Sequence, residues 1–225
     1  MSGRSSRRRG VLVGNEAERT PTVFNVGSSI CLLRERGHFD IEGPESTGVR
    51  VWPAAVALAR FFERSPRDSV LGRRVLELGC GLGLVGLAAL AMGAERVLLT
   101  DVAGMLPTLW RTLELNPFFC RRGLVEVDDL DWRHVAEGRK TVPGPFGLIC
   151  WADCVHWPEL FEPLCATLER LAGPDTVVLF SAESRGRTEA FLQRMRRSFR
   201  VFEVWKSRAA APGDVDVRIF RGKRC

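Results

Sequence analysis

Apolar and polar positions alternate along the chain in blocks that predict strands and helices in turn. Short, nearly continuous apolar runs predict buried strands at 75–78, 97–100, 124–127, 146–153 and 176–180. Between these runs, apolar residues recur three and four positions apart and predict helices over 84–92, 106–113, 160–171 and 188–198. Strands that alternate with helices pair in parallel and are covered by helices on both faces, so the pattern predicts an α/β fold.

The two ends of the chain depart from this alternation. Residues 22–26 and 29–33, separated by Gly27 and Ser28, predict a hairpin that covers one edge of the domain. Near the other end, strands predicted at 200–205 and 215–220 have no helix between them, and the second alternates apolar and polar residues. An antiparallel pair therefore closes the parallel sheet and makes seven strands. This architecture resembles that of the class I methyltransferases, and the resemblance implies the strand order 3-2-1-4-5-7-6.

Two helices in the first half of the chain are predicted from apolar stripes. One begins at Pro53, because proline fits the first helical turn, and it is expected to lie across the mouth of a ligand site. The positions that share one face of these helices are Ala55, Leu58, Ala59 and Phe62 in the first, and Leu106, Leu109, Trp110 and Leu113 in the second.

The segment from Arg74 to Asp101 is typical of a strand, a glycine turn, a helix and a second strand. Gly79, Gly81 and Gly83 let the backbone turn sharply and approach a ligand closely. Asp101 ends the second strand, where a carboxylate can accept hydrogen bonds from both hydroxyls of a ribose. The segment predicts a nucleoside-binding βαβ unit.

Two nucleoside ligands fit this unit, and a structural glycine turn without a ligand is the alternative. Gly81-Leu-Gly83-Leu-Val-Gly86, with Asp101 twenty positions after Gly81, satisfies the dinucleotide fingerprint. The overlapping segment Glu77-Leu-Gly79-Cys-Gly81-Leu-Gly83 instead resembles S-adenosylmethionine-dependent methyltransferases. We favour the second ligand, because a methionyl ammonium needs a nearby acid such as Glu77, whereas a pyrophosphate needs the helix dipole aimed at it.

Length and composition indicate an ordinary soluble protein. The chain has 225 residues, of which 45% are hydrophobic and 27% charged, and no apolar run approaches the ~20 residues that span a bilayer. We therefore expect no membrane partner. Residues 1–20 are expected to form a disordered basic tail without a signal peptide, and residues 21–225 a single domain with the hairpin as an extension.

Cysteine and charge patterns exclude some partners. The seven cysteines form no Cys-x-x-Cys pair and there are only three histidines, so no metal site is expected. The cysteines are those of a reduced protein of the cytoplasm, or also of the nucleus. The net charge of +6 would permit nucleic-acid contact, but four of the arginines lie within residues 1–10, so no nucleic-acid partner is expected.

Five short motifs together resemble one family. They are Val51-Trp-Pro-Ala-Ala, Leu76-Glu-Leu-Gly-Cys-Gly-Leu-Gly-Leu-Val-Gly86, Thr100-Asp101, Leu130-Asp-Trp132 and Ala152-Asp-Cys-Val155. Their order and spacing resemble the seven-β-strand protein-lysine methyltransferases, a group that acts on chaperones, elongation factors and valosin-containing protein. The resemblance covers residues 22–221 and implies a class I S-adenosylmethionine-dependent methyltransferase (Rossmann-like) fold.

The resemblance also implies the site, the cofactor and the partner. S-adenosyl-L-methionine is the expected cofactor, and the partner is a protein substrate, a non-histone protein methylated on a lysine by a monomeric enzyme. Trp132 is expected to pack by the adenine while Asp131 accepts from its amino group. The expected cofactor contacts are Trp52, Gly79, Cys80, Gly81, Asp101, Trp132 and Ala152.

The chain departs from the family at its catalytic motif. The family has Asp-x-x-Tyr after the fourth strand, whereas this chain has Asp153-Cys-Val-His156 followed by Trp157 and contains no tyrosine. Asp153 is expected to orient the incoming ammonium, and His156 or Trp157 to supply a wall or a proton acceptor. We therefore take Asp153 and His156 as the catalytic candidates.

The departure leaves two other functions open. A methyltransferase acting on another protein side chain or on nucleic acid is one, although the Asn/Asp-Pro-Pro-Tyr motif of nucleic-acid amino-methyltransferases is absent. A module that binds the cofactor without turnover is the other.

Overall fold

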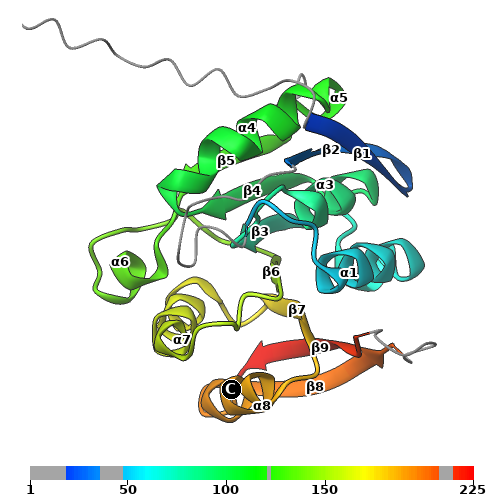
Figure 1. Ribbon diagram of the computed structural model, residues 1–225. Helices are drawn as coiled ribbons and strands as arrows, with labels where there is room; N and C mark the ends of the chain where they lie inside the picture. Colours follow the sequence, from blue (N-terminus) through cyan, green and yellow to red (C-terminus); the bar gives the residue numbers. More distant parts are fainter. Residues whose placement is uncertain (1–18, 36–47, 121–122, 208–214) are drawn as a thin grey trace, which may run out of the picture.

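A computed structural model of the protein has a seven-stranded mixed sheet at its centre (Figure 1). The structure describes residues 19–35, 48–120, 123–207 and 215–225. The strands of the central sheet are β3 (Arg74–Leu78), β4 (Arg96–Asp101), β5 (Val125–Asp129), β6 (Leu148–Ala152), β7 (Val177–Glu183), β8 (Phe199–Lys206) and β9 (Val217–Arg224). Their order is β5-β4-β3-β6-β7-β9-β8, and only the pairs that include β9 are antiparallel. This is the predicted strand order and fold class.

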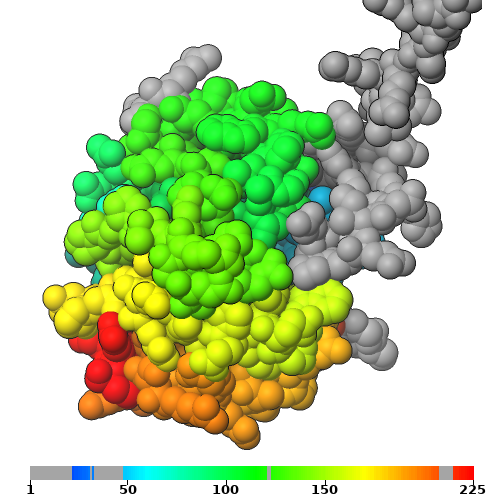
Figure 2. Space-filling model, turned by 90° about the vertical axis from the view of Figure 1, so that its left-hand side faces the viewer, coloured from blue at the N-terminus to red at the C-terminus, as the bar shows by residue number. Residues whose placement is uncertain are grey.

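Helices cover both faces of the sheet. The larger ones are α1 (Pro53–Arg64), α3 (Leu84–Ala91), α4 (Leu106–Glu114), α7 (Phe161–Leu171) and α8 (Gly186–Met195), and the short ones are α2 (Pro66–Ser69), α5 (Pro117–Cys120), α6 (Trp132–Ala136), η3 (Ala103–Met105) and η4 (Pro158–Leu160). Buried residues of α1, α3 and α4 belong to one apolar cluster, and those of α6, α7 and α8 to another. Figure 2 shows the face on which the residues around α6 lie above those of α7 and α8.

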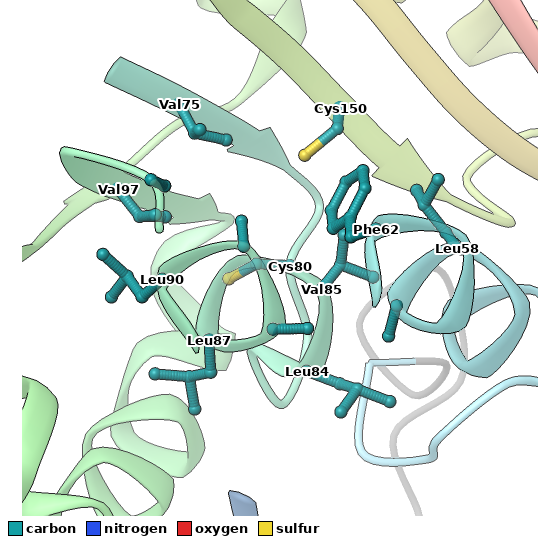
Figure 3. Packing of buried hydrophobic residues seen from close by; sticks show 14 of the residues in the cluster. Leu58, Phe62, Val75, Cys80, Leu84, Val85, Leu87, Leu90, Val97 and Cys150 are labelled. Carbon is teal, nitrogen blue, oxygen red and sulfur yellow. The ribbon is translucent and has the colours of Figure 1, made fainter. Parts of the chain in front are cut away.

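The central strands are apolar throughout because both of their faces are buried. Along β6, Leu148 and Cys150 belong to the cluster under α1 and α3, whereas Ile149 and Trp151 belong to the cluster under α7 and α8. Figure 3 shows Phe62 of α1 near Cys150 on this side of the sheet. Alternation between two buried faces explains why the sequence shows a continuous apolar run rather than a half-polar strand.

The N-terminal hairpin is present, as predicted. β1 (Arg19–Val26) and β2 (Ser28–Glu35) pair antiparallel in a separate sheet, and β2 contacts α3 and α4. The hairpin therefore packs on helices that cover one face of the central sheet. Of the tail predicted at 1–20, residues 1–18 lie outside the described residues, and Arg19 and Thr20 belong to β1.

Two other predictions need correction. Trp110 was expected on the buried stripe of α4, but 51% of its surface is exposed, and Thr112 is buried beside Leu109 and Leu113 instead. The helix α6 was not predicted, because its five residues make little more than one turn and show no helical periodicity. Among the described residues, no helix combines the length and apolar character needed to cross a membrane.

Candidate active site

A cavity of about 390 Å³ opens where β3, β4 and β6 end. The segment before α1, the start of α6 and the residues after β6 complete its wall. All the residues predicted to bind the cofactor or to act in catalysis line this cavity: Trp52, Gly79, Cys80, Gly81, Asp101, Trp132, Ala152, Asp153 and His156. Carboxyl ends of adjacent parallel strands meet at one edge of the sheet, which is why residues so distant in sequence come together.

The glycine loop after β3 depends on residues without side chains. Gly79, Gly81 and Gly83 have φ angles of 60°, 52° and 78°, in the left-handed region that disfavours other residues. A methyl group on Gly81 would lie 2.7 Å from the carbonyl oxygen of Gly48, and one on Gly79 would lie 2.8 Å from Sγ of Cys154. The loop is therefore held between the segment before α1 and the segment after β6, with its backbone on the cavity wall.

We expect Gly81→Ala to weaken cofactor binding at least tenfold. Alanine at a left-handed position costs about 1–2 kcal/mol, and at residue 81 its methyl group also pushes against Gly48, so the loop must move. Isothermal calorimetry with S-adenosylhomocysteine measures the affinity. Gly72→Ala is the matched control, because Gly72 has φ 67° with no atom near an added methyl group. Equal affinities for the two variants would contradict the prediction.

Asp101 holds the glycine loop as well as facing the cavity. Its Oδ2 accepts a 2.7 Å hydrogen bond from the Gly81 amide, and Oδ1 accepts a 2.8 Å bond from the Val102 amide. Its carbonyl oxygen accepts a 2.7 Å bond from the Leu130 amide, which ties the end of β4 to the segment that begins α6. One residue thus links the turn after β3 to the wall that carries Trp132.

Asp131 is the N-cap residue of α6. Oδ1 of Asp131 accepts a 2.9 Å hydrogen bond from the Arg133 amide, and the Arg133 guanidinium pairs with both carboxylate oxygens. The Arg133 side chain holds the pKa of Asp131 below its ordinary value. That Asp131 accepts a hydrogen bond from an adenine stays a prediction. Its charge is already paired with Arg133 in the structure.

Glu77 lines the cavity, but its side chain makes its hydrogen bond within the protein. It is 2% exposed, and its Oε2 accepts a 2.7 Å hydrogen bond from the amide of Gly86 in the first turn of α3. Burial raises the pKa of Glu77 to about 8, against the lowering effect of that bond. Glu77 was expected to lie near a methionyl ammonium, but its carboxyl group is hydrogen-bonded to the amino terminus of α3.

We expect Glu77 to make the protein without cofactor less stable as pH rises from about 5 to about 8. In this window the folded protein keeps the Glu77 proton, whereas the unfolded chain, with a pKa near 4.5, has released it, so unfolding is favoured as pH rises. Glu77→Gln keeps an acceptor for Gly86 and removes the titration. Urea unfolding at both pH values should show a fall in wild type, by a few kcal/mol at most, that the variant lacks. Equal pH dependence in both would contradict it.

Cys80 contributes its backbone to the cavity rather than its thiol. Its side chain is 7% exposed and lies in the cluster with Val85 of α3 and Phe62 of α1 (Figure 3). Burial raises the pKa of the Cys80 thiol well above its ordinary value. The thiol is therefore an apolar core group, and any contact of residue 80 with a cofactor is made by the main chain.

Asp153 is held in an unusual conformation just after β6. Its φ is 54°, the residue is 5% exposed, and its amide donates a 2.8 Å hydrogen bond to the carbonyl of Ser181 on β7. Oδ1 accepts a long, 3.4 Å bond from the Glu183 amide, while Oδ2 has no hydrogen-bond partner among the described residues. A left-handed residue that is not glycine costs energy, and its fixed geometry turns a buried carboxylate toward the cavity.

His156 lies beside this carboxylate. Its Nε2 is 3.3 Å from Oδ2 of Asp153 without the alignment of a hydrogen bond, and its ring centroid is 5.2 Å from that of Trp52 at an angle of 45°. Trp157 also lines the cavity, and its buried indole nitrogen lacks a partner among the described residues. The two catalytic candidates and two tryptophans therefore form one polar and aromatic corner.

Some site residues were missed by sequence reasoning. Arg50 and Met105 line the cavity, and their residue types gave no signal of it. Glu183 and Arg185 contact the catalytic candidates from the end of β7. Their position after a parallel strand next to β6 was a usable signal, since ligands bind outside the carboxyl ends of such strands.

Fold and cavity together define a class I methyltransferase, with a βαβ nucleoside unit in a seven-stranded sheet. Among solved structures of this fold, the S-adenosylmethionine-dependent methyltransferase from Agrobacterium tumefaciens superposes with a TM-score of 0.61 at 18% identity, over 96% of this chain and 73% of that one. The chain belongs to the lysine methyltransferase family, whose model matches residues 38–198.

Curated relatives agree with this assignment. Protein N-lysine methyltransferase METTL21A from Danio rerio is 42% identical over 156 residues, which are 68% of this chain and 69% of that protein. EEF1A lysine methyltransferase 3 from Mus musculus is 31% identical over 176 residues, or 77% of this chain and 71% of that protein. Family membership confirms the predicted resemblance, the class of enzyme and the cofactor S-adenosylmethionine, and it decides against the dinucleotide alternative. The roles of individual site residues stay predictions.

Proposed function

We propose that this protein transfers methyl groups to the side-chain amine of a lysine in a non-histone protein. The observation that carries the proposal is the Asp153 carboxylate, which is buried on the cavity wall and whose Oδ2 has no hydrogen-bond partner among the described residues. A buried, unpaired acceptor is costly unless a ligand completes it, and a cationic amine is the partner that a carboxylate prefers.

The residues of the cavity fit the cofactor. The carboxylate of Asp101 lies in the wall for a ribose, the left-handed glycines leave the backbone open, and Trp132 offers an aromatic face for an adenine. When bound, S-adenosylmethionine supplies an electrophilic methyl group on a sulfonium.

The work of the chain is to orient the acceptor and to exclude water. A lysine amine has a reference pKa near 10.4, so it arrives as an ammonium that the charge of Asp153 attracts. Trp52 and Trp157 line the same corner, where aromatic faces stabilise a desolvated cation. Once the ammonium has lost a proton to water, these residues would hold its nitrogen toward the methyl group that the bound cofactor would supply.

A single labelling experiment tests this proposal. The full-length protein is incubated with tritiated S-adenosylmethionine and cell lysate, with and without nuclease, and the labelled residue is identified by mass spectrometry. We expect nuclease-resistant label on a lysine that Asp153→Asn does not produce. Nuclease-sensitive label would assign a nucleic-acid substrate, and no label above a no-enzyme control would assign a cofactor-binding module.

The proposal includes a monomeric enzyme. Light scattering coupled to size exclusion measures the mass directly. Cytoplasmic or nuclear location stays a prediction.

A further inference from the structure

A line of four side chains runs from the end of β7 into the cavity. Glu183 is 4% exposed and pairs with Nη2 of Arg185. The other terminal nitrogen of that guanidinium, Nη1, lies 3.3 Å from Nδ1 of His156, and Nε2 of His156 lies 3.3 Å from Oδ2 of Asp153. Each member therefore faces the next, and the last one is the carboxylate proposed to receive the lysine.

The chemistry of arginine decides the protonation of the histidine in this line. A guanidinium carries only donors and keeps its charge at every pH at which the protein is folded. A contact with it is favourable when Nδ1 of His156 is bare and accepts, which leaves the ring proton on Nε2. If Nδ1 carried a proton, as in the other neutral tautomer or in the imidazolium, its N–H would point at an N–H of the Arg185 guanidinium, and the two donors would repel each other.

No other charged group in the described chain competes at the ring nitrogens of His156. Nη1 of Arg187 donates a 2.8 Å hydrogen bond to the backbone carbonyl of residue 156, not to its ring. The Trp52 ring lies beside the His156 ring at an angle of 45°, and Glu159, which lies in the same cavity wall, makes no hydrogen bond to it among the described residues. Arg185 and Asp153 are therefore the charged groups that face the two nitrogens.

We propose that Arg185 is a positioning residue that holds His156 in the neutral form with its proton on Nε2, aimed at Asp153. This inference rests on the proposed function and narrows it. In this form the Nε2–H of His156 faces the Asp153 carboxylate at 3.3 Å and His156 has no free lone pair toward the substrate, so it does not take the lysine proton. The proton leaves to water, and Asp153 acts as the anion that fixes the ammonium.

The first test is spectroscopic and needs no substrate. Long-range proton–nitrogen NMR reports which imidazole nitrogen carries the proton, and His38→Gln/His134→Gln leaves His156 as the only histidine of the full chain. At about pH 8 we expect a bare Nδ1 and a protonated Nε2. A proton on Nδ1, or on both nitrogens, would overturn the proposal.

The second test removes the guanidinium. In the same background, Arg185→Met should mix the two tautomers, Arg185→Lys should preserve the Nε2-protonated form because it keeps a cationic donor, and the control Arg187→Met should also preserve it. If Arg185→Met does not fold by circular dichroism, Arg185→Gln takes its place. An unchanged tautomer in a folded variant that lacks the cation would overturn the assignment of Arg185.

The third test links the tautomer to methyl transfer. Arg185→Met should lower the single-turnover rate about tenfold, which corresponds to about 1.4 kcal/mol, with Arg185→Lys near wild type and S-adenosylhomocysteine affinity unchanged in both. Equal loss of rate and affinity would assign a structural role instead and overturn the proposal. If wild-type protein labels no lysine, the proposed function fails, while the NMR result still decides the tautomer separately.

Discussion

Replacing Asp153 with asparagine is expected to lower the single-turnover rate of methyl transfer by about 10²-fold while leaving cofactor affinity unchanged. Asparagine keeps the size of the side chain and tolerates the φ of 54°, so the turn after β6 should persist. What is lost is the negative charge that attracts and orients the ammonium. Calorimetry with S-adenosylhomocysteine and single-turnover transfer to the labelled substrate measure the two quantities on the same preparation.

Asp129→Asn is the matched control for the loss of a carboxylate. Asp129 ends another parallel strand, β5, and is exposed and paired with Lys140. We expect this variant to transfer methyl groups at the wild-type rate. If Asp153→Asn also keeps its activity, or if its rate and affinity fall together, Asp153 is a turn residue and does not orient the substrate.

Replacing Asp101 with alanine is expected to weaken cofactor binding by about 1.5–3 kcal/mol, which is roughly ten- to 150-fold. Two losses contribute. The carboxylate proposed to hold the ribose disappears, and the amide of Gly81 loses its 2.7 Å hydrogen bond, so the glycine loop is no longer fixed. Calorimetric titration with S-adenosylhomocysteine measures the change.

Asp101→Asn separates these two losses. The asparagine carbonyl can still accept from Gly81 but carries no charge, so we expect an affinity between those of wild type and Asp101→Ala. Thermal unfolding of each variant without cofactor shows whether the fold persists. Unchanged affinity in folded Asp101→Ala would remove this residue from the binding site.

Much of the fold follows from local pattern. The βαβ unit around Gly79 was readable because a strand buried on both faces is apolar at every position and glycine permits a left-handed turn. The antiparallel pairing of β8 and β9 was readable because their segments have no crossover helix between them. The order of all seven strands came from the resemblance to class I methyltransferases. Elements of about one turn, such as α6, carry too few residues to display a period, and Trp110 fell on an apolar stripe without being buried.

The residues of the candidate site were also predicted in part from local sequence. Residue type and place after a strand pointed to Asp101, Asp153 and His156, because carboxyl ends of parallel strands gather at one edge of a sheet. Family resemblance added the tryptophans, which periodicity alone could not separate from core residues.

Contacts between distant segments were decided by the tertiary structure alone. The carbonyl of Gly48 lies against Gly81, and Arg185 reaches His156 from a different strand end. Nothing in the local sequence specifies such pairs, because they depend on the register and twist of strands that are far apart along the chain. The sequence by itself determined which groups were available for chemistry, and the packing of the sheet determined which atom each of them faces.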